Sequence, residues 1–224
     1  MGNEPLGGRP HAVRNVLKSA AALGLVAVIG TTLIAGVHSL TAERIAAQER
    51  RLVLQRLNEV LAPARYDNAL HEDRFEFQNE TYFPNGQTVV AYRARREGEP
   101  VAVILEFQAV NGYNGKIGLL AGIDADGTLT GVRVTSHKET PGLGDPIEAE
   151  KSDWIRQFRG KSLGNPKPDD WAVRRDGGAF DQFTGATITP RAVVQAIRRA
   201  LTFFAAQRDM LFNSETEPVD GTAS

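Results

Sequence analysis

The residues best suited to chemistry form the segment Thr184-Gly185-Ala186-Thr187, which follows Asp181 and precedes a helix-forming stretch. Thr189 followed by Pro190 fits the start of that helix, because threonine is a favoured N-cap and proline costs nothing where the N–H has no helical partner. Thr187 precedes this cap by two residues, so its side chain can project past the helix end. Unpaired N–H groups and the positive end of the helix dipole favour a phosphate there. A capping turn without a ligand uses the same residues, so both interpretations stay open.

A second group occupies the loop Ser136-His137-Lys138-Glu139-Thr140-Pro141-Gly142-Leu143-Gly144-Asp145. His137 and Glu139 could donate, accept or exchange protons, and the two glycines would let backbone N–H groups approach a ligand. An ordinary connection with a polar surface has the same composition, and this alternative also stays open. Upstream, residues 111–115 predict a hairpin turn, in which Tyr113 could also stack on a flat ring.

Composition removes several classes of site. The chain has no cysteine among its 224 residues, which excludes thiol nucleophiles, disulfides, Cys-ligated zinc and iron–sulfur clusters. Any redox chemistry must therefore use another cofactor. With only four histidines, we expect no histidine-rich metal centre. The formal net charge of −1 provides no basic excess, so we expect no nucleic-acid partner.

The elements that must position these residues can be read from the hydrophobic pattern. Four β-rich runs, at 89–94, 101–110, 116–123 and 128–136, are separated by short polar turns and predict an antiparallel meander. After it we expect a polar helix near Glu148 to Phe158, a short strand at 171–175 and a long C-terminal helix. That helix has an apolar face formed by Val193, Val194, Ile197, Leu201 and Phe204. The predicted fold class is α+β, with an antiparallel sheet and flanking helices.

The N-terminal part predicts a membrane anchor. Residues 19–42 contain no Asp, Glu, Lys or Arg and follow a basic flank, 1–18. A helix of this length can cross a hydrocarbon core of about 30 Å. A cleaved secretory signal is the competing interpretation, but the apolar stretch is longer than a usual signal core and lacks a clear cleavage site. We expect a single span in a bacterial inner membrane, with the N-terminus cytoplasmic and the rest periplasmic.

The remaining boundaries follow from periodicity and composition. Residues 43–62 place apolar side chains at three- and four-residue intervals among charges, which predicts an amphipathic stalk helix that ends before Pro63. We expect the folded domain over residues 63–212. The polar residues 213–224 then form a C-terminal tail.

Taken together, these motifs resemble a known family. Thr184-Gly185-Ala186-Thr187 after Asp181, the pattern His137-x-Glu139-Thr140-Pro141-Gly142-Leu143-Gly144, and Gly112-Tyr113-x-Gly115 occur in the order found in covalent FMN-binding domains of bacterial respiratory complexes. With one N-terminal anchor and this length, the chain is similar to the G subunits of Rnf (Rsx) electron-transport complexes. Thr184 occupies a position where serine is more common in that pattern.

The resemblance implies a specific cofactor chemistry. In that family the last threonine of the motif, here Thr187, carries one FMN through a phosphoester that a separate flavin transferase makes from FAD. The chain would be an electron-relaying subunit of a ferredoxin/NAD-linked, ion-translocating complex, with other subunits and membrane lipid as partners. The implied cofactor site comprises Thr187 with Thr184, Gly185, Ala186, Asp181, Glu139, Thr140, Gly142, Leu143, Gly144 and Tyr113.

Two other functions remain as alternatives. The C subunit of the sodium-translocating NADH:quinone oxidoreductase has a similar anchor and flavin motif, although its extracytoplasmic region is generally longer. A membrane-anchored binding or assembly module without redox activity would use the Gly-rich loops to hold a partner. A covalent flavin would distinguish the flavoproteins from this module.

Overall fold

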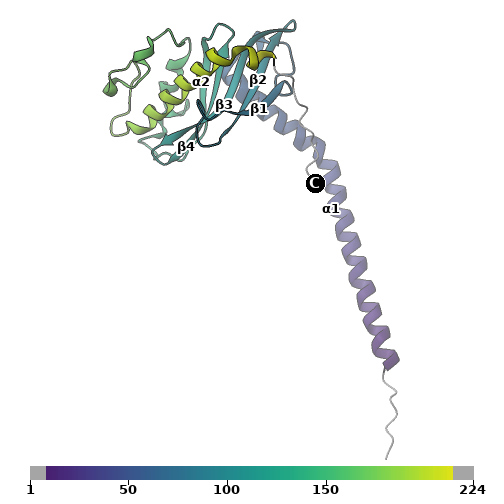
Figure 1. Ribbon diagram of the computed structural model, residues 1–224. Coiled ribbons are helices and arrows are strands. Elements are labelled where there is room, and N and C mark those ends of the chain that lie inside the picture. The colour runs from purple at the N-terminus through teal and green to yellow at the C-terminus, as the bar shows by residue number, and fades with distance from the viewer. Residues whose placement is uncertain (1–8, 214–224) are drawn as a thin grey trace, which may run out of the picture. The chain divides into compact units, whose positions relative to one another are not determined.

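The computed structural model describes residues 9–213, and the chain divides into two compact units that meet between Arg51 and Leu52. Part of the predicted flank 1–18 and all but the first residue of the predicted tail 213–224 lie outside the described residues. Helix α1 (Arg9–Val60) belongs to both units. The second unit carries the sheet and helix α2 (Figure 1).

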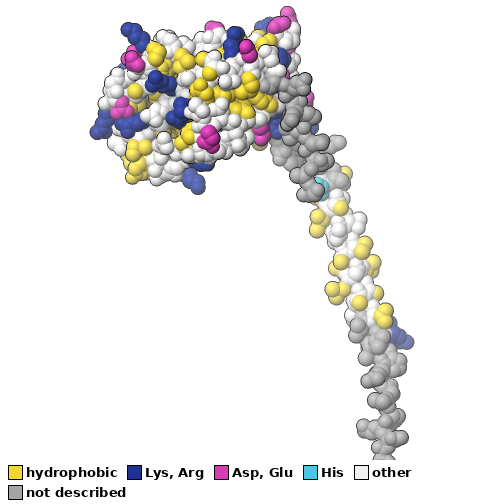
Figure 2. All heavy atoms as spheres, in the orientation of Figure 1, with side chains coloured by type: hydrophobic (Ala, Val, Ile, Leu, Met, Phe, Trp, Pro, Cys, Tyr) yellow, Lys and Arg dark blue, Asp and Glu magenta, His cyan; other side chains and the backbone are white. Residues whose placement is uncertain are grey.

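Helix α1 runs without interruption through the regions predicted as anchor and stalk. Its segment Leu17–His38, 22 residues, is long and apolar enough to span a membrane, since about 1.5 Å per residue gives about 33 Å. Figure 2 shows apolar side chains projecting from this part of the helix. The helix ends at Val60, before Pro63 begins a short 3₁₀ turn, Pro63–Arg65, because proline at this point cannot extend an α-helix.

The sheet is a five-stranded antiparallel meander in which every strand pairs with its sequence neighbours (Figure 1). The four predicted runs are confirmed, and the fold class is α+β. A fifth strand at the sheet edge, β1, escaped prediction because its five residues, RFEFQ, carry only two apolar side chains. The strands are β1 (Arg74–Gln78), β2 (Thr88–Arg96), β3 (Glu99–Gly112), β4 (Gly115–Asp124) and β5 (Leu129–Ser136).

Each face of the sheet is covered by a helix. Helix α2 (Ile188–Asn213) packs along β3 (Figure 1) and buries the predicted apolar stripe in the larger hydrophobic cluster. The last turns of α1 contribute Leu57 and Val60 to a second cluster with Tyr92 and Ile104. Thr130 Oγ1 also donates a hydrogen bond of 2.6 Å to the Val60 carbonyl. The central strands β3 and β4 are therefore buried on both faces of the sheet.

The long connection from β5 to α2 differs from its prediction. In place of a helix near Glu148 to Phe158 there is a 3₁₀ turn, Trp154–Phe158, and in place of a strand at 171–175 there is a single bridge between Val173 and Phe180. Both predictions were wrong. A cluster of aromatic rings organises this segment instead: Phe158 stacks on Phe180 with centroids 4.8 Å apart, and Trp171 lies 4.9 Å from Phe180.

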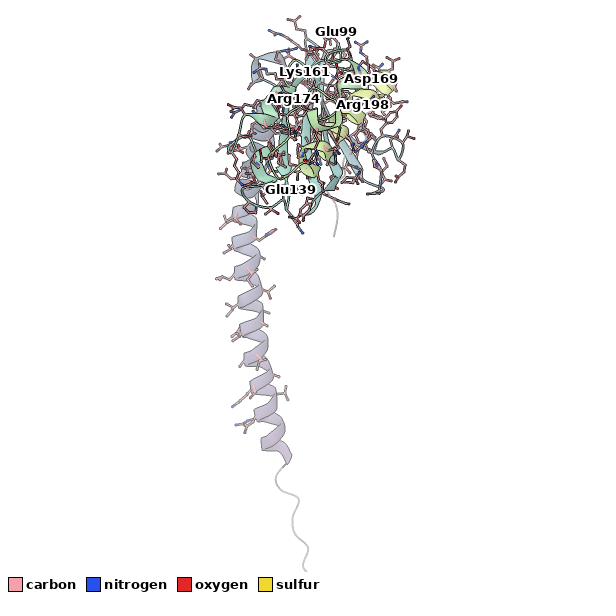
Figure 3. The ribbon with its side chains drawn as sticks, turned by 90° about the vertical axis from the view of Figure 1, so that its left-hand side faces the viewer. Glu99, Glu139, Lys161, Asp169, Arg174 and Arg198 are labelled. Atoms are coloured by element: carbon pink, nitrogen blue, oxygen red, sulfur yellow. The ribbon has the colours of Figure 1, made fainter. Side chains whose placement is uncertain are left out.

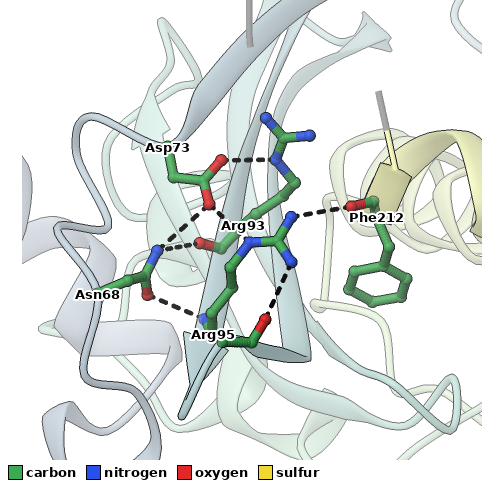
Figure 4. A network of polar contacts seen from close by, with 6 residues as sticks. Asn68, Asp73, Arg93, Arg95 and Phe212 are labelled. Atoms are coloured by element: carbon green, nitrogen blue, oxygen red, sulfur yellow. Dashed lines mark hydrogen bonds and ion pairs between the residues drawn. The ribbon is translucent and has the colours of Figure 1, made fainter. Parts of the chain in front are cut away.

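A network of hydrogen bonds and ion pairs links the segment before β1, strand β2 and the last turn of α2 (Figure 4). Asp73 accepts hydrogen bonds from Nε of Arg93 at 2.6 Å and from Nε of Arg95 at 3.0 Å. Arg95 also donates to the carbonyl of Phe212 at 3.0 Å, near the end of α2. The side-chain amide of Asn68 donates to the Arg93 carbonyl at 2.9 Å. The segment before β1, strand β2 and helix α2 are thereby joined.

Candidate flavin site

A cavity of about 380 Å³ lies where the β3–β4 turn, the loop after β5 and the start of α2 meet. This volume is in the range of small-molecule and cofactor sites. Of the residues predicted for the site, eight line the cavity: Tyr113, Glu139, Thr140, Leu143, Gly144, Gly185, Ala186 and Thr187. The lining also includes Ile188 and Thr189, which were not predicted as site residues. Thr184, Asp181 and Gly142 lie outside the lining.

Glu139 joins the three segments around this cavity, and Figure 3 shows it at one end of the domain. Its side chain is buried, with 4% of the residue exposed. The carboxylate accepts hydrogen bonds from the backbone N–H of Asn114 at 2.9 Å and of Tyr113 at 3.3 Å. It also accepts one from the Thr189 hydroxyl. These donors compensate for the loss of water around a buried charge. Glu139 therefore acts as a crosslink within the site.

The contact with Glu139 corrects the predicted role of Thr189. We expected the Thr189 hydroxyl to cap the helix, but α2 begins at Ile188 and the Thr189 hydroxyl donates to Glu139 instead. The backbone N–H of Arg191 donates to the Thr187 carbonyl at 3.2 Å, which is the first bond of the helical pattern. Thr187 therefore occupies the N-cap position, at the end of the helix where N–H groups are unpaired.

The turn before Thr187 depends on glycine. Gly185 has φ of +83°, a left-handed conformation that glycine adopts without steric cost. Ala186 donates its N–H to the Phe183 carbonyl at 3.2 Å, closing the turn. Thr184 is exposed to solvent in this turn. The turn thus presents Thr187, and not Thr184, to the cavity.

Asp181 supports this turn from outside the cavity. Its carboxylate forms an ion pair with Arg174 at 3.1 Å, and its carbonyl accepts a hydrogen bond from the Trp154 indole at 2.7 Å. Asp181 therefore anchors the turn to the aromatic cluster.

His137 lies behind the loop. Its Nδ1 accepts a hydrogen bond from the Glu139 N–H at 3.0 Å, so the proton is on Nε2, which lies 2.6 Å from Oε1 of Glu148. Lys151 completes this cluster with contacts of 2.9 Å to Glu148 and to Asp145. Hydrogen bonds from Lys151 and then His137 lower the pKa of the Glu148 carboxyl. His137 thus orients the backbone of Glu139.

The loop is also fixed at Gly142, whose N–H donates to Asp145 at 2.6 Å. Hydrogen bonds from Lys151, followed by the one from Gly142, lower the pKa of the Asp145 carboxyl. Gly142 has φ of +77°, a left-handed conformation that glycine adopts without steric cost. Gly142 therefore shapes the loop from outside the cavity lining.

Apolar side chains surround the cavity mouth. Tyr113, Leu143 and Ile188 are 65%, 46% and 45% exposed, which is unusual for large hydrophobic residues of a folded domain. A flavin phosphate needs N–H donors, and its ring needs flat apolar surfaces. The site offers both features, because the start of α2 and this apolar rim both border the cavity. The described residues therefore fit FMN.

Comparisons with known proteins agree with this geometry. Residues 112–202 match the family described as FMN-binding domain, and residues 9–60 match the family described as RnfG N-terminal region. The G subunit of the ion-translocating oxidoreductase complex from Pseudomonas aeruginosa strain UCBPP-PA14 is 48% identical over 206 residues, covering 90% of this chain and 94% of that protein. The chain belongs to this family of G subunits.

Further members of the family show similar agreement. The Shewanella loihica protein is 44% identical over 89% of this chain and 94% of its own length, and a Vibrio cholerae protein is 43% identical over 92% and 98%. Among solved structures, the C subunit of the Na(+)-translocating NADH-quinone reductase from Parabacteroides distasonis is 16% identical with a TM-score of 0.46, covering 75% of this chain and 96% of that one. The match of residues 112–202 to the FMN-binding domain family confirms the prediction that the chain contains an FMN-binding domain.

Proposed function

We propose that this chain is the electron-relaying subunit of an ion-translocating oxidoreductase complex and carries one FMN through a phosphoester on Thr187. The main support for this proposal is the position of Thr187, which occupies the N-cap of α2 and lines a cavity with an apolar rim. The family match to an FMN-binding domain supports the choice of cofactor. The bound flavin would supply the ability to accept and pass on single electrons.

The chain's own residues would hold the cofactor in place. The N–H groups at the start of α2 stabilise negative charge beside Thr187. Tyr113, Leu143 and Ile188 offer apolar surface that can cover a ring and keep water from part of it. Glu139 fixes the relative positions of the hairpin turn and the helix start through its three hydrogen bonds. A preformed site of this kind lowers the cost of ordering the cofactor.

Attachment would require a separate flavin transferase with FAD as the donor. The Thr187 oxygen forms a bond to the flavin-side phosphorus while the P–O–P bond of FAD breaks and AMP leaves. The hydroxyl proton passes to a base. The product is heavier than the chain by FMN less one water. A covalent bond would retain the cofactor in an extracytoplasmic domain.

The anchor helix supports a location in the bacterial inner membrane. The basic residues before position 19 favour a cytoplasmic N-terminus, which would leave the FMN domain periplasmic. Partner subunits of the complex and membrane lipid would surround the segment Leu17–His38. A phosphatase reporter that works only in the periplasm, fused to the C-terminus, should be active. Activity of a cytoplasmic reporter at that position would refute the orientation.

The attachment site can be tested by mass spectrometry. The full chain, coexpressed with a flavin transferase, should gain one FMN less one water on the peptide that contains Thr187. Thr187→Ala should abolish the adduct and the in-gel flavin fluorescence, whereas the matched change Thr184→Ala should retain both because Thr184 does not line the cavity. An adduct on Thr184 or Thr189 would overturn the assignment. Copurification of the other complex subunits would test the proposed assembly.

A further inference from the structure

A turn that contains two arginines lies beside the proposed attachment site. The 3₁₀ turn Arg174–Asp176 is held against the segment that leads into α2 by several contacts. The backbone N–H of Arg175 donates to the side chain of Gln182 at 3.2 Å. Asp176 forms a two-pronged ion pair with Arg191 on α2, at 2.6 and 2.7 Å. These contacts place the turn next to the positive end of the helix.

Two of the three arginines at this place are already paired with carboxylates. Arg174 pairs with Asp181 at 3.1 Å, and Arg191 uses both oxygens of Asp176. Hydrogen bonds from Arg191 lower the pKa of the Asp176 carboxyl, and the nearby charge of Arg175 adds a smaller effect. Within residues 9–213, Arg175 forms no ion pair with a carboxylate. Its Nη1 donates instead to Oγ1 of Thr187, at 3.3 Å.

We propose that Arg175 is the phosphate-binding cation of this site. The inference rests on the proposed function, in which Oγ1 of Thr187 is bonded to phosphorus. A guanidinium that already lies 3.3 Å from that oxygen can reach the other phosphate oxygens by rotating its exposed side chain. A phosphodiester carries one negative charge, and the helix terminus provides only a partial positive charge. Arg175 supplies the full countercharge with donors arranged to bind two oxygens.

Sequence reasoning did not find this residue, because Arg175 precedes Thr187 by twelve positions in an exposed turn. The aromatic cluster fixes the position of this turn, because Val173, just before the turn, forms a β-bridge with Phe180, a member of that cluster. Gly177, with φ of +86°, ends the turn and lets the chain reverse direction. Thus the proximity of Arg175 to Thr187 is a property of the tertiary structure.

The test compares Arg175→Gln with Arg175→Lys and with the control Arg198→Gln, in the full chain purified in detergent. Arg198 is an exposed arginine on α2 that does not line the cavity, and Figure 3 shows its label well apart from Glu139. All variants are first compared by thermal unfolding without flavin, where we expect no change because Arg175 is exposed. Flavin attachment is then followed over time by intact mass with a transferase and FAD.

We expect Arg175→Gln to slow attachment by about tenfold, the lower end of the effect of a hydrogen bond to a charged group. Arg175→Lys should restore part of the rate, and Arg198→Gln should match the wild type. In the flavinylated proteins, the ³¹P resonance of the phosphodiester should shift in Arg175→Gln and stay unchanged in Arg198→Gln.

The two proposals fail in different ways. If the wild type gains flavin on Thr187 while Arg175→Gln matches it in both attachment rate and ³¹P resonance, the role of Arg175 is refuted and the proposed function stands. If the wild type gains no flavin on Thr187, both are refuted. A loss of stability without flavin in Arg175→Gln, together with an unchanged ³¹P resonance once that variant carries flavin, would assign Arg175 a purely structural role and overturn the inference.

Discussion

Removal of the Glu139 carboxylate should loosen the whole site. Glu139→Ala deletes three hydrogen bonds to a buried charge, from Asn114, Tyr113 and Thr189. Hydrogen bonds to charged groups contribute roughly 1.5–3 kcal/mol each. The two backbone donors belong to an exposed turn and can bind water after the change, which offsets part of this loss. We therefore expect a decrease in the free energy of unfolding of about 3 kcal/mol.

Conservative variants of Glu139 and Thr189 separate the contributions of the individual hydrogen bonds to this loss of stability. Glu139→Gln should cost only about 1–2 kcal/mol, because the amide oxygen can still accept from Asn114 while the amide nitrogen donates to the Thr189 hydroxyl. The weaker contact with Tyr113, at 3.3 Å, would be lost. Thr189→Val removes one donor and should also cost roughly 1–2 kcal/mol, whereas Thr189→Ser keeps the hydroxyl and should cost less.

The assay is thermal unfolding of the full chain in detergent, without flavin. For a domain of this size, a change of 1 kcal/mol moves the midpoint by about 2–4 °C, so Glu139→Ala should lower it by about 6–12 °C. Flavin absorption of the loaded protein should also change, because the hairpin turn that carries Tyr113 would move relative to α2. A midpoint within about 1 °C of the wild type would refute the reasoning that Glu139 joins these segments.

Three further predictions concern the scaffold. Asp73→Asn should lower the free energy of unfolding by roughly 3 kcal/mol in urea denaturation, because the guanidinium of Arg93, only 1% exposed, loses the negative charge 2.6 Å from its Nε (Figure 4). The exposed change Asp169→Asn is the control, and equal effects of the two changes would contradict the prediction. Gly178→Ala should sharply lower the midpoint of thermal unfolding, because the added Cβ would lie 2.0 Å from the Ala172 carbonyl oxygen. The control Gly164→Ala should leave the midpoint unchanged, because a Cβ at this position would have no atom within 4 Å. The stability lost in Lys151→Met should be constant between pH 4.5 and pH 10.5 and should shrink below pH 3.8. Lys151 lowers the pKa of Glu148 and Asp145 from their ordinary values of 4.5 and 3.8, and these carboxylates raise the pKa of Lys151 from 10.5. A difference in stability that is unchanged down to about pH 2 would argue against these pairs.

The sequence alone predicted those elements that have a strong local pattern. Four strands are runs rich in β-forming apolar residues between short turns, and helix α2 repeats apolar residues at helical spacing, so each element has a local signal in the sequence. The charge-free stretch at 19–42 predicted the anchor segment, because an apolar helix of this length can span a membrane. The residues of the motif 184–187 could be predicted as a group, because they are adjacent in the chain.

Only the tertiary structure decided how distant residues meet. Strand β1 has few apolar residues and forms at the edge through pairing with β2, and the segment 145–187 is organised by ring packing that has no period in the sequence. Thr189 satisfies every local rule for an N-cap, yet its hydroxyl bonds to Glu139, fifty residues away in the chain. Arg175 reaches Thr187 because two turns pack together. Such contacts form when long loops close around a core, so the local preferences of single residues cannot predict them.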